Sequence, residues 1–282
     1  MKKLLVLSAF MVASLSLEAQ IETPAPSPFS KTEQTVGLTD VTLEYSRPSM
    51  RGRTIFGDLV PYDKLWRTGA NAYTKINFSD DVTIDGQEVK AGTYSIFTKP
   101  GKDNWEVFFY TDTEGGGTPE KWEESKIAAK TTSEVYDLPM DIETFTITFD
   151  DLTSSSANLG MMWENAYVPV TIEVPTDKMV SKNIETAMSG SPKGEDYYTA
   201  AVYYLDEDKD INKAQEWMEK AMEMTEEPAF WQLRQQSLIQ AKAGDKKAAI
   251  KTAKKSLAKA KEAGNDDYVK MNNDSLKEWG AK

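Results

Sequence analysis

Between residues 31 and 175 the apolar side chains mostly alternate with polar ones. Val41, Leu43 and Tyr45, for example, are separated by single polar residues, which is the pattern of a half-buried strand. The pattern continues in later segments: Ile76 and Phe78, Val82 and Ile84, Tyr94 to Phe97, Trp105 to Tyr110, Phe145 to Phe149, Leu159 to Trp163, and Val168 to Val174. It predicts about eight to ten strands, as in a β-sandwich. A hairpin turn is predicted at Asp85-Gly86, and one helix over residues 119–130.

From about residue 176 the apolar period changes from 2 to 3.6, which predicts helices over residues 176–282. Small residues at Ala214 and Ala221 recur 35 residues later at Ala249 and Ser256, and the period resembles that of tetratricopeptide repeats. A helix is predicted over Phe230 to Lys242. The final helix, Asp266 to Trp279, is predicted to cap the array by burying Tyr268, Met271, Leu276 and Trp279. The predicted fold class is therefore an all-β, sandwich-like N-terminal domain followed by all-α, TPR-like helical hairpins.

The N-terminus is typical of a secretory signal. Lys2 and Lys3 precede an apolar run over residues 4–17, and Ala19 is a small residue suited to cleavage. We predict a signal peptide over residues 1–19 and a proline-rich leader over residues 20–30. The run is shorter than the roughly 18 residues needed to span a bilayer. We therefore expect an exported protein, periplasmic or secreted, with no membrane span after signal cleavage.

Composition removes several classes of function. The chain has a net charge of −12, no cysteine and no histidine. Cysteine and histidine nucleophiles, imidazole bases and the usual zinc ligands are therefore absent, and a bound metal or cofactor is not expected. The acidic balance disfavours nucleic acid as a partner. Any acid–base chemistry would fall to Asp, Glu, Lys or Tyr.

Arginine is concentrated in one segment. Four of the five arginines, Arg47, Arg51, Arg53 and Arg67, lie within residues 47–67, although the chain as a whole prefers lysine. Guanidinium groups match carboxylate and phosphate, Trp66 adds a flat aromatic face, and the amide of Asn71 can hydrogen-bond to hydroxyls. These six residues are our candidate site for an anionic or sugar-like ligand. The alternative is structural: the arginines pair with Asp58, Asp63 and other acidic residues and pin the loop to the sheet.

The same segment resembles a known family. The blocks Arg51-Gly-Arg-Thr-Ile-Phe-Gly57 and Trp66-Arg-Thr-Gly-Ala-Asn71 occur in order, followed by Ala91-Gly-Thr-Tyr-Ser-Ile-Phe97. These blocks resemble the family known as domain of unknown function 2911, over roughly residues 30 to 175. The resemblance implies an exported β-rich domain without an established activity, and it implies no catalytic residue.

Two lysine-rich features have simpler explanations than function. Ser256 and Lys259 have the spacing of a catalytic serine–lysine pair, but they lie on a repeat helix without companion motifs, and we reject that role. The lysines of residues 242–261 are interpreted as a solvated helix face, with docking of an acidic partner as the alternative.

Two classes of function remain open. The first is an exported binding and interaction protein, in which the arginine-rich loop binds a ligand and the helical hairpins bind a protein partner. The second is a hydrolase of glycans or esters that uses carboxylates and an arginine clamp. The catalytic residues of such a hydrolase are unknown from the sequence. Arginines converging on a cleft with two unpaired carboxylates would favour the hydrolase, whereas arginines paired with Asp58 or Asp63 would oppose both.

Overall fold

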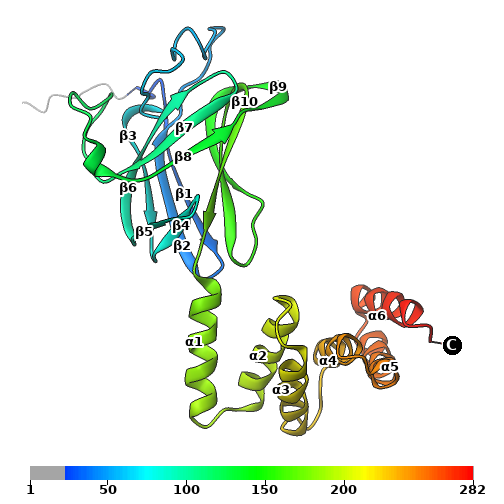
Figure 1. The fold of residues 1–282 in the computed structure, drawn as a ribbon. Coiled ribbons are helices and arrows are strands. Elements are labelled where there is room, and N and C mark those ends of the chain that lie inside the picture. The colour runs from blue at the N-terminus through cyan, green and yellow to red at the C-terminus, as the bar shows by residue number, and fades with distance from the viewer. Residues whose placement is uncertain (1–22, 282) are drawn as a thin grey trace, which may run out of the picture. The chain divides into compact units, whose positions relative to one another are not determined.

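The computed structural model describes residues 23–281, and the chain divides into two compact units between Pro175 and Thr176. Within the described residues, the N-terminal unit contains two antiparallel β-sheets and the C-terminal unit six α-helices (Figure 1). The predicted fold class, a sandwich-like β-domain followed by paired helices, is confirmed.

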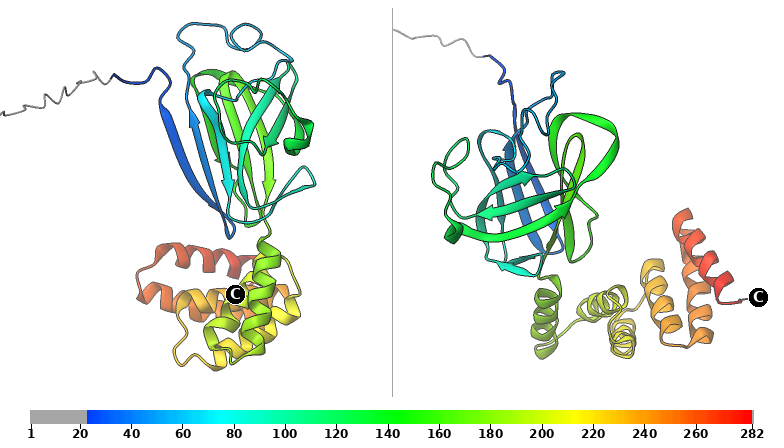
Figure 2. Two further views of the ribbon diagram at one scale, coloured as in Figure 1. Left: turned by 90° about the vertical axis from the view of Figure 1, so that its left-hand side faces the viewer. Right: turned by 45° about the horizontal axis from the view of Figure 1, so that its top comes forward.

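Two sheets form the N-terminal unit. The larger has the spatial order β1-β2-β3-β6-β7-β8, with β1 Phe29–Val36, β2 Thr39–Ser46, β3 Ala70–Phe78, β6 Gly92–Pro100, β7 Asn104–Tyr110 and β8 Ile127–Glu134. The smaller has the order β5-β4-β10-β9, with β4 Val82–Ile84, β5 Gln87–Val89, β9 Tyr136–Asp150 and β10 Ser156–Glu173. The sheets lie face to face (Figure 2). All neighbouring strands in both sheets are antiparallel.

One hydrophobic core joins the two sheets. Leu43 and Ile76 from the larger sheet, and Met161 and Val170 from the smaller, are each at most 3% exposed within it. Because side chains alternate across a strand, the apolar half of each strand faces the opposite sheet. Burial of each such side chain contributes roughly 1.5–3 kcal/mol to folding, so the alternation in the sequence is sufficient to define which faces meet.

The helix predicted over residues 119–130 is wrong. Only Glu124–Lys126 forms a helical turn, of the 3-10 type, and Ile127 begins strand β8. The apolar residues of this segment cover the outer face of the larger sheet instead of one side of a helix. The ring of Trp122 stacks on that of Tyr110, with 4.5 Å between centroids and 15° between planes. Tertiary packing of this aromatic residue therefore overrides the local helical pattern.

Two strand boundaries also differ from those expected. Strand β1 begins at Phe29, inside the predicted leader 20–30, of which residues 20–22 lie outside the described part. The segments expected at residues 159–163 and 168–174 fall on the single strand β10, which ends at Glu173. Two shifts in register interrupt its pairing with β9, one on each side of Glu164. Such bulges bend a strand without ending it.

The C-terminal unit consists of α1 Thr176–Ser189, α2 Gly194–Asp206, α3 Ile211–Glu223, α4 Phe230–Lys242, α5 Lys246–Glu262 and α6 Asp266–Glu278. Asp210, Asp245 and Asn265 precede α3, α5 and α6, and their side chains accept hydrogen bonds from the first-turn backbone. These N-caps satisfy donors that a helix leaves unpaired. The helix predicted over Phe230 to Lys242 is confirmed.

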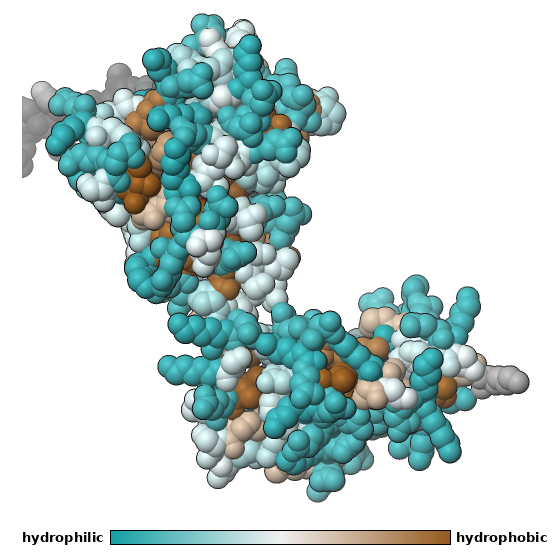
Figure 3. All heavy atoms as spheres, in the orientation of Figure 1, coloured by the Kyte–Doolittle hydropathy of each residue, from teal (hydrophilic) through white to brown (hydrophobic). Residues whose placement is uncertain are grey.

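Small residues allow the helices to pack closely in pairs. Ala214 on α3 and Ala249 on α5 are fully buried, as their recurrence suggests. The predicted burial of Met271 is wrong, because this side chain on α6 is 37% exposed while Leu276 is buried. The identity of these hairpins as tetratricopeptide repeats stays a prediction. Within residues 23–281, no helix is long and apolar enough to cross a membrane. The surface visible in Figure 3 is mainly hydrophilic, with scattered hydrophobic side chains.

Candidate ligand-binding pocket

The arginine-rich loop connects β2 to β3 and is attached to both sheets. At its start, Met50 N–H donates to the Glu143 carbonyl and Phe145 N–H donates to the Pro48 carbonyl, each at 2.8 Å, along the edge of β9. At its end, Trp66 exchanges two backbone hydrogen bonds with Thr98 of β6, at 2.7 and 2.9 Å. These bonds hold the loop at both ends, so the side chains between them are presented from a defined backbone.

The middle of the loop is held by Glu164. Its two carboxylate oxygens accept from the backbone N–H groups of Ile55, at 3.2 Å, and Phe56, at 3.1 Å. Glu164 lies at the bulge of β10 with φ of 54°, a conformation uncommon for residues other than glycine. The bulge thus turns this carboxylate toward the loop, where it satisfies two backbone donors.

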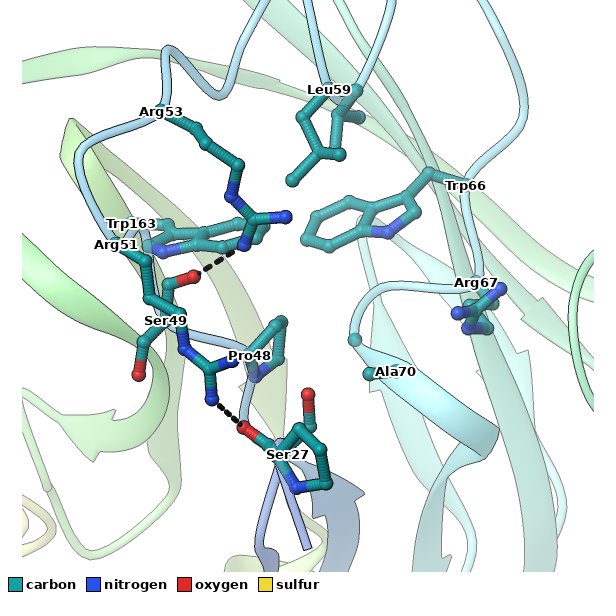
Figure 4. Close-up of a pocket in the computed structure, with 13 residues that line it drawn as sticks. Ser27, Pro48, Ser49, Arg51, Arg53, Leu59, Trp66, Arg67, Ala70 and Trp163 are labelled. Carbon is teal, nitrogen blue, oxygen red and sulfur yellow. Dashed lines mark hydrogen bonds between the residues drawn. The ribbon is translucent and has the colours of Figure 1, made fainter.

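The loop encloses a pocket of about 360 Å³. Its walls come from the loop, from the segment before β1, and from β3 and β10: Pro26, Ser27, Pro48, Ser49, Arg51, Arg53, Leu59, Val60, Trp66, Arg67, Gly69, Ala70 and Trp163. Figure 4 shows Arg51 and Arg53 on one side of the pocket and Arg67 on the other. Among the described residues that line it, none is acidic. Three arginines therefore line a space whose described wall contains no carboxylate.

Arg51 and Arg53 are held by neutral backbone oxygens. Arg53 donates from Nε to the Met50 carbonyl at 2.8 Å and from Nη2 to the Ser49 carbonyl at 2.7 Å. Arg51 donates from Nη2 to the Pro26 carbonyl at 2.7 Å. A carbonyl orients a guanidinium but does not neutralise its charge, so both groups retain their attraction for an anion.

Arg67 differs from the other two arginines because its Nε is buried and has no hydrogen-bond partner within the described residues. A buried donor without a partner costs about 1–3 kcal/mol, and such groups require a specific explanation. Arg67 is also one of the residues that line the pocket.

Aromatic rings form another part of the wall. Trp66 is half-buried and stacks on Trp163, with 5.8 Å between centroids and 19° between planes. Trp163 is 1% exposed, and its Nε1 donates to the Glu143 carbonyl. The pair gives the pocket a flat apolar surface beside its cationic groups.

Two of the six predicted site residues do not line the pocket. Arg47 donates from Nε to the Phe145 carbonyl at 3.1 Å and from Nη2 to the Thr146 hydroxyl at 2.6 Å. Asn71 donates from Nδ2 to the Ser27 carbonyl and the Ser46 hydroxyl, each at 3.2 Å. Both side chains join structural segments around the pocket, whereas Arg51, Arg53, Trp66 and Arg67 line it.

The sequence did not identify the pocket's contribution from β10. Trp163 is 97 positions from Trp66 along the chain and belongs to an alternating apolar run that indicates only core packing. The pairing of loop arginines with Asp58 or Asp63 is not found: no ion pair in the described part of the chain involves Arg47, Arg51, Arg53 or Arg67.

Carboxylates occur in a separate, smaller pocket of about 200 Å³, lined in part by Asp137 and Glu164. Glu164 already accepts the two loop N–H groups, and Asp137 accepts from Asn165 Nδ2 at 3.3 Å. Over residues 23–281 there is no group of three or more acidic, cysteine or histidine side chains able to hold a metal ion.

Comparison with known proteins identifies one family. The model of a family described as "Protein of unknown function (DUF2911)" matches residues 27–172, a range that contains every residue of the pocket wall except Pro26. No curated protein and no solved structure matches the chain.

Proposed function

The chain belongs to the DUF2911 family of proteins of unknown function, and we propose, from its own residues, that it is a binding protein whose pocket takes a small anionic ligand. The observation that carries the proposal is the set of three arginines, Arg51, Arg53 and Arg67, around one pocket with no acidic residue among its described lining. Such a concentration of positive charge in an acidic protein favours a negatively charged occupant.

The chemistry of the pocket narrows the ligand class. Guanidinium groups bind carboxylate and phosphate through parallel hydrogen bonds. The indole of Trp66 and the side chain of Leu59 offer apolar surface to the remainder of the ligand. A volume of about 360 Å³ lies near the lower end of the range for small-molecule sites. An acidic monosaccharide or a small phosphorylated compound fits these properties.

The pocket provides less support for hydrolysis. A carboxylate-dependent glycosidase needs two carboxyl groups on either side of the scissile bond, and the described lining of the arginine pocket contains no such group. In the smaller pocket, Glu164 binds backbone N–H groups of the loop. Binding without turnover is therefore the better supported function, and the hydrolase remains an alternative that an assay of glycan and ester cleavage can test.

The test is a ligand panel on the mature, full-length protein. Melting temperature and calorimetric affinity are measured with phosphate, pyrophosphate, citrate and glucuronate, with glucose as the neutral match for glucuronate. At a concentration 100 times Kd, a ligand stabilises the native state by about 2.7 kcal/mol. We expect at least one anion to raise the melting temperature and glucose to have no effect. A panel in which glucose and the anions behave alike would exclude an anion site.

Export of the protein is part of the same proposal. It is supported by the lysines, apolar run and Ala19 at the N-terminus, in a segment outside the described residues. Intact-mass measurement on protein recovered outside the cytoplasm tests it, because the expected mature chain begins at Gln20. If the recovered protein still contained residues 1–17, cleavage of a signal peptide during export would be contradicted.

We also propose a protein partner for the helical unit. Its support is a groove of about 440 Å³ with Leu205, Leu238 and Trp279 in its wall, which offers apolar surface to a protein. Quantitative co-purification tests this with Leu238→Asp in the groove and Lys251→Asp on the exposed side of α5 as the control. Loss of one defined partner with the first variant alone is expected, whereas equal recovery with both would contradict the proposal.

A further inference from the structure

The segment before β1 forms one wall of the arginine pocket. Three successive carbonyl groups of this segment accept hydrogen bonds from the loop region. Arg51 Nη2 donates to Pro26 O at 2.7 Å, Asn71 Nδ2 to Ser27 O at 3.2 Å, and the Arg47 backbone N–H to Pro28 O at 2.9 Å. The bond from Arg51 is one of the two drawn in Figure 4. The protein's own backbone thus occupies a donor of a pocket arginine.

This contact depends mainly on hydrogen bonds. Residues 23–26 are exposed, and Ser27 is half-buried, so little apolar burial opposes their departure. Pro24, Pro26 and Pro28 restrict the backbone to extended conformations, which lowers the entropy that the segment loses on docking. The segment can therefore rest in the pocket without being an integral part of the core.

We propose that residues 23–27 are a strap that closes one side of the pocket and is displaced when an anionic ligand takes Arg51. This inference rests on the proposed function. A carboxylate or phosphate adds the attraction between opposite charges and can accept two parallel hydrogen bonds from one guanidinium. The Pro26 carbonyl is neutral and accepts one bond from Arg51, so an anion in the pocket competes favourably with it.

The exchange requires motion of side chains and of the strap only. The Arg51 backbone N–H donates to Glu143 Oε1 at 2.9 Å, which keeps the loop attached to β9 when the guanidinium changes partner. Asn71 lies outside the pocket and holds the strap through Ser27. It therefore sets how readily the strap leaves, and Arg47 anchors the point at which the strap joins β1.

The first test follows the strap directly. Because the chain contains no cysteine, Ala25→Cys carries a single nitroxide label on the strap, and Ala258→Cys on exposed α5 is the control. We expect the label at position 25 to be immobilised without ligand and to become mobile in the Asn71→Gly background. Glycine tolerates the φ of 58° at this position. A label equally mobile in both backgrounds would overturn the strap.

The second test measures competition. Phosphate, pyrophosphate, citrate and glucuronate are titrated into the labelled protein while affinity is measured by calorimetry. We expect the bound anion to mobilise the label at position 25 and leave that at position 258 unchanged. Asn71→Gly removes one hydrogen bond to the strap, so the anion should bind about two- to tenfold more tightly.

The results separate the two proposals. An anion that binds while the label at position 25 stays immobile overturns the strap and leaves the anion site standing. Weaker binding by Asn71→Gly also overturns the strap, because it shows that Asn71 contributes to the ligand site as the sequence predicted. If no anion binds either wild type or Asn71→Gly, the proposed function fails and competition with the strap fails with it.

Discussion

The indole rings of Trp66 and Trp163 lie 5.8 Å apart with 19° between their planes, so a loop and a distant strand together build one aromatic wall of the pocket. Trp163 is 1% exposed, whereas Trp66 is half-buried and lines the opening. Trp163 therefore supports the wall from within the core, and Trp66 is the ring that a ligand meets.

We predict that Trp66→Leu weakens binding of glucuronate by about fivefold, since loss of a ring contact costs on the order of 1 kcal/mol, and leaves phosphate affinity unchanged. Phosphate has no ring to stack. The matched control is Trp122→Leu, which removes a ring stacked on Tyr110 over the outer face of the larger sheet. Calorimetry at a temperature at which both variants are folded measures their affinities for phosphate and glucuronate. Equal loss of phosphate and glucuronate affinity in Trp66→Leu would mean that the ring acts through packing alone.

Much of the β-unit could be predicted because alternation determines which side of a strand is buried. The turn at Asp85-Gly86 is confirmed, with φ values of 49° and 71°, since few residue pairs adopt these angles. Strand β1 escaped detection because it lies at a sheet edge and buries only Val36 fully. Backbone hydrogen bonds pair it with β2. Such bonds do not depend on apolar side chains, so they leave no hydrophobic pattern in the sequence.

The sequence could predict which residue types line the pocket, but not the directions in which their side chains point. The arginine concentration identified Arg51, Arg53 and Arg67, because guanidinium chemistry is visible in the residue type. Arg47 is also an arginine, but its guanidinium donates hydrogen bonds to the Phe145 carbonyl and the Thr146 hydroxyl of β9. The direction of a side chain depends on strand pairing between distant segments, which local sequence does not encode.

We predict that Glu164→Ala lowers the free energy of unfolding by about 1–3 kcal/mol, because the N–H groups of Ile55 and Phe56 lose their acceptors. It should also weaken anion binding, because the loop that Glu164 anchors includes Arg53, which lines the pocket. Without the anchor, Arg53 is held less firmly. Glu164→Gln retains one acceptor oxygen and is expected to lose less of both. Urea unfolding and calorimetry give the two quantities. An alanine variant as stable as wild type would show that these bonds do not hold the loop.

Tyr167 gives a pH-dependent prediction. Burial, with Asp150 nearby, raises the pKa of Tyr167 to about 12, and its hydroxyl donates to Asp150 Oδ2 at 3.2 Å. The unfolded phenol titrates near 10, so its stabilising contribution is complete below about pH 10 and is lost as pH rises through 12. Tyr167→Phe should be less stable than wild type at pH 8, by on the order of 1 kcal/mol, and the difference should shrink above pH 10. Urea unfolding from pH 8 to 11.5 measures this, and a constant difference would contradict it.

Ser256 is predicted to be structural. Its buried hydroxyl donates to the Phe230 carbonyl at 2.7 Å and accepts from Asn272 Nδ2 at 2.9 Å, and Lys259 Nζ donates to the Pro228 carbonyl. Ser256→Ala should cost about 1–3 kcal/mol and leave ester hydrolysis unchanged, with exposed Ser181→Ala as the control. Loss of an esterase activity without loss of stability would instead support a nucleophilic serine.

Arg67 and Arg47 provide the most direct comparison between binding and structural roles, because both are half-buried arginines at the ends of the same loop. Arg47 has two protein partners on β9, whereas the buried Nε of Arg67 has none within the described residues. Lysine retains the charge at either position but not the planar set of donors. The same substitution therefore removes protein contacts at one position and prospective ligand contacts at the other.

We predict that Arg67→Lys changes the melting temperature little and weakens binding of phosphate or glucuronate by about 1.5–3 kcal/mol, or roughly 12- to 150-fold, the range for a hydrogen bond to a charged group. Arg47→Lys should show the reverse, with about 1–2 kcal/mol lost from stability and affinity retained, because it leaves the Phe145 carbonyl without its side-chain donor. Thermal unfolding and calorimetry on both variants separate these effects. If Arg67→Lys melts well below wild type and binds normally, Arg67 belongs to the scaffold and the anion site loses its principal support.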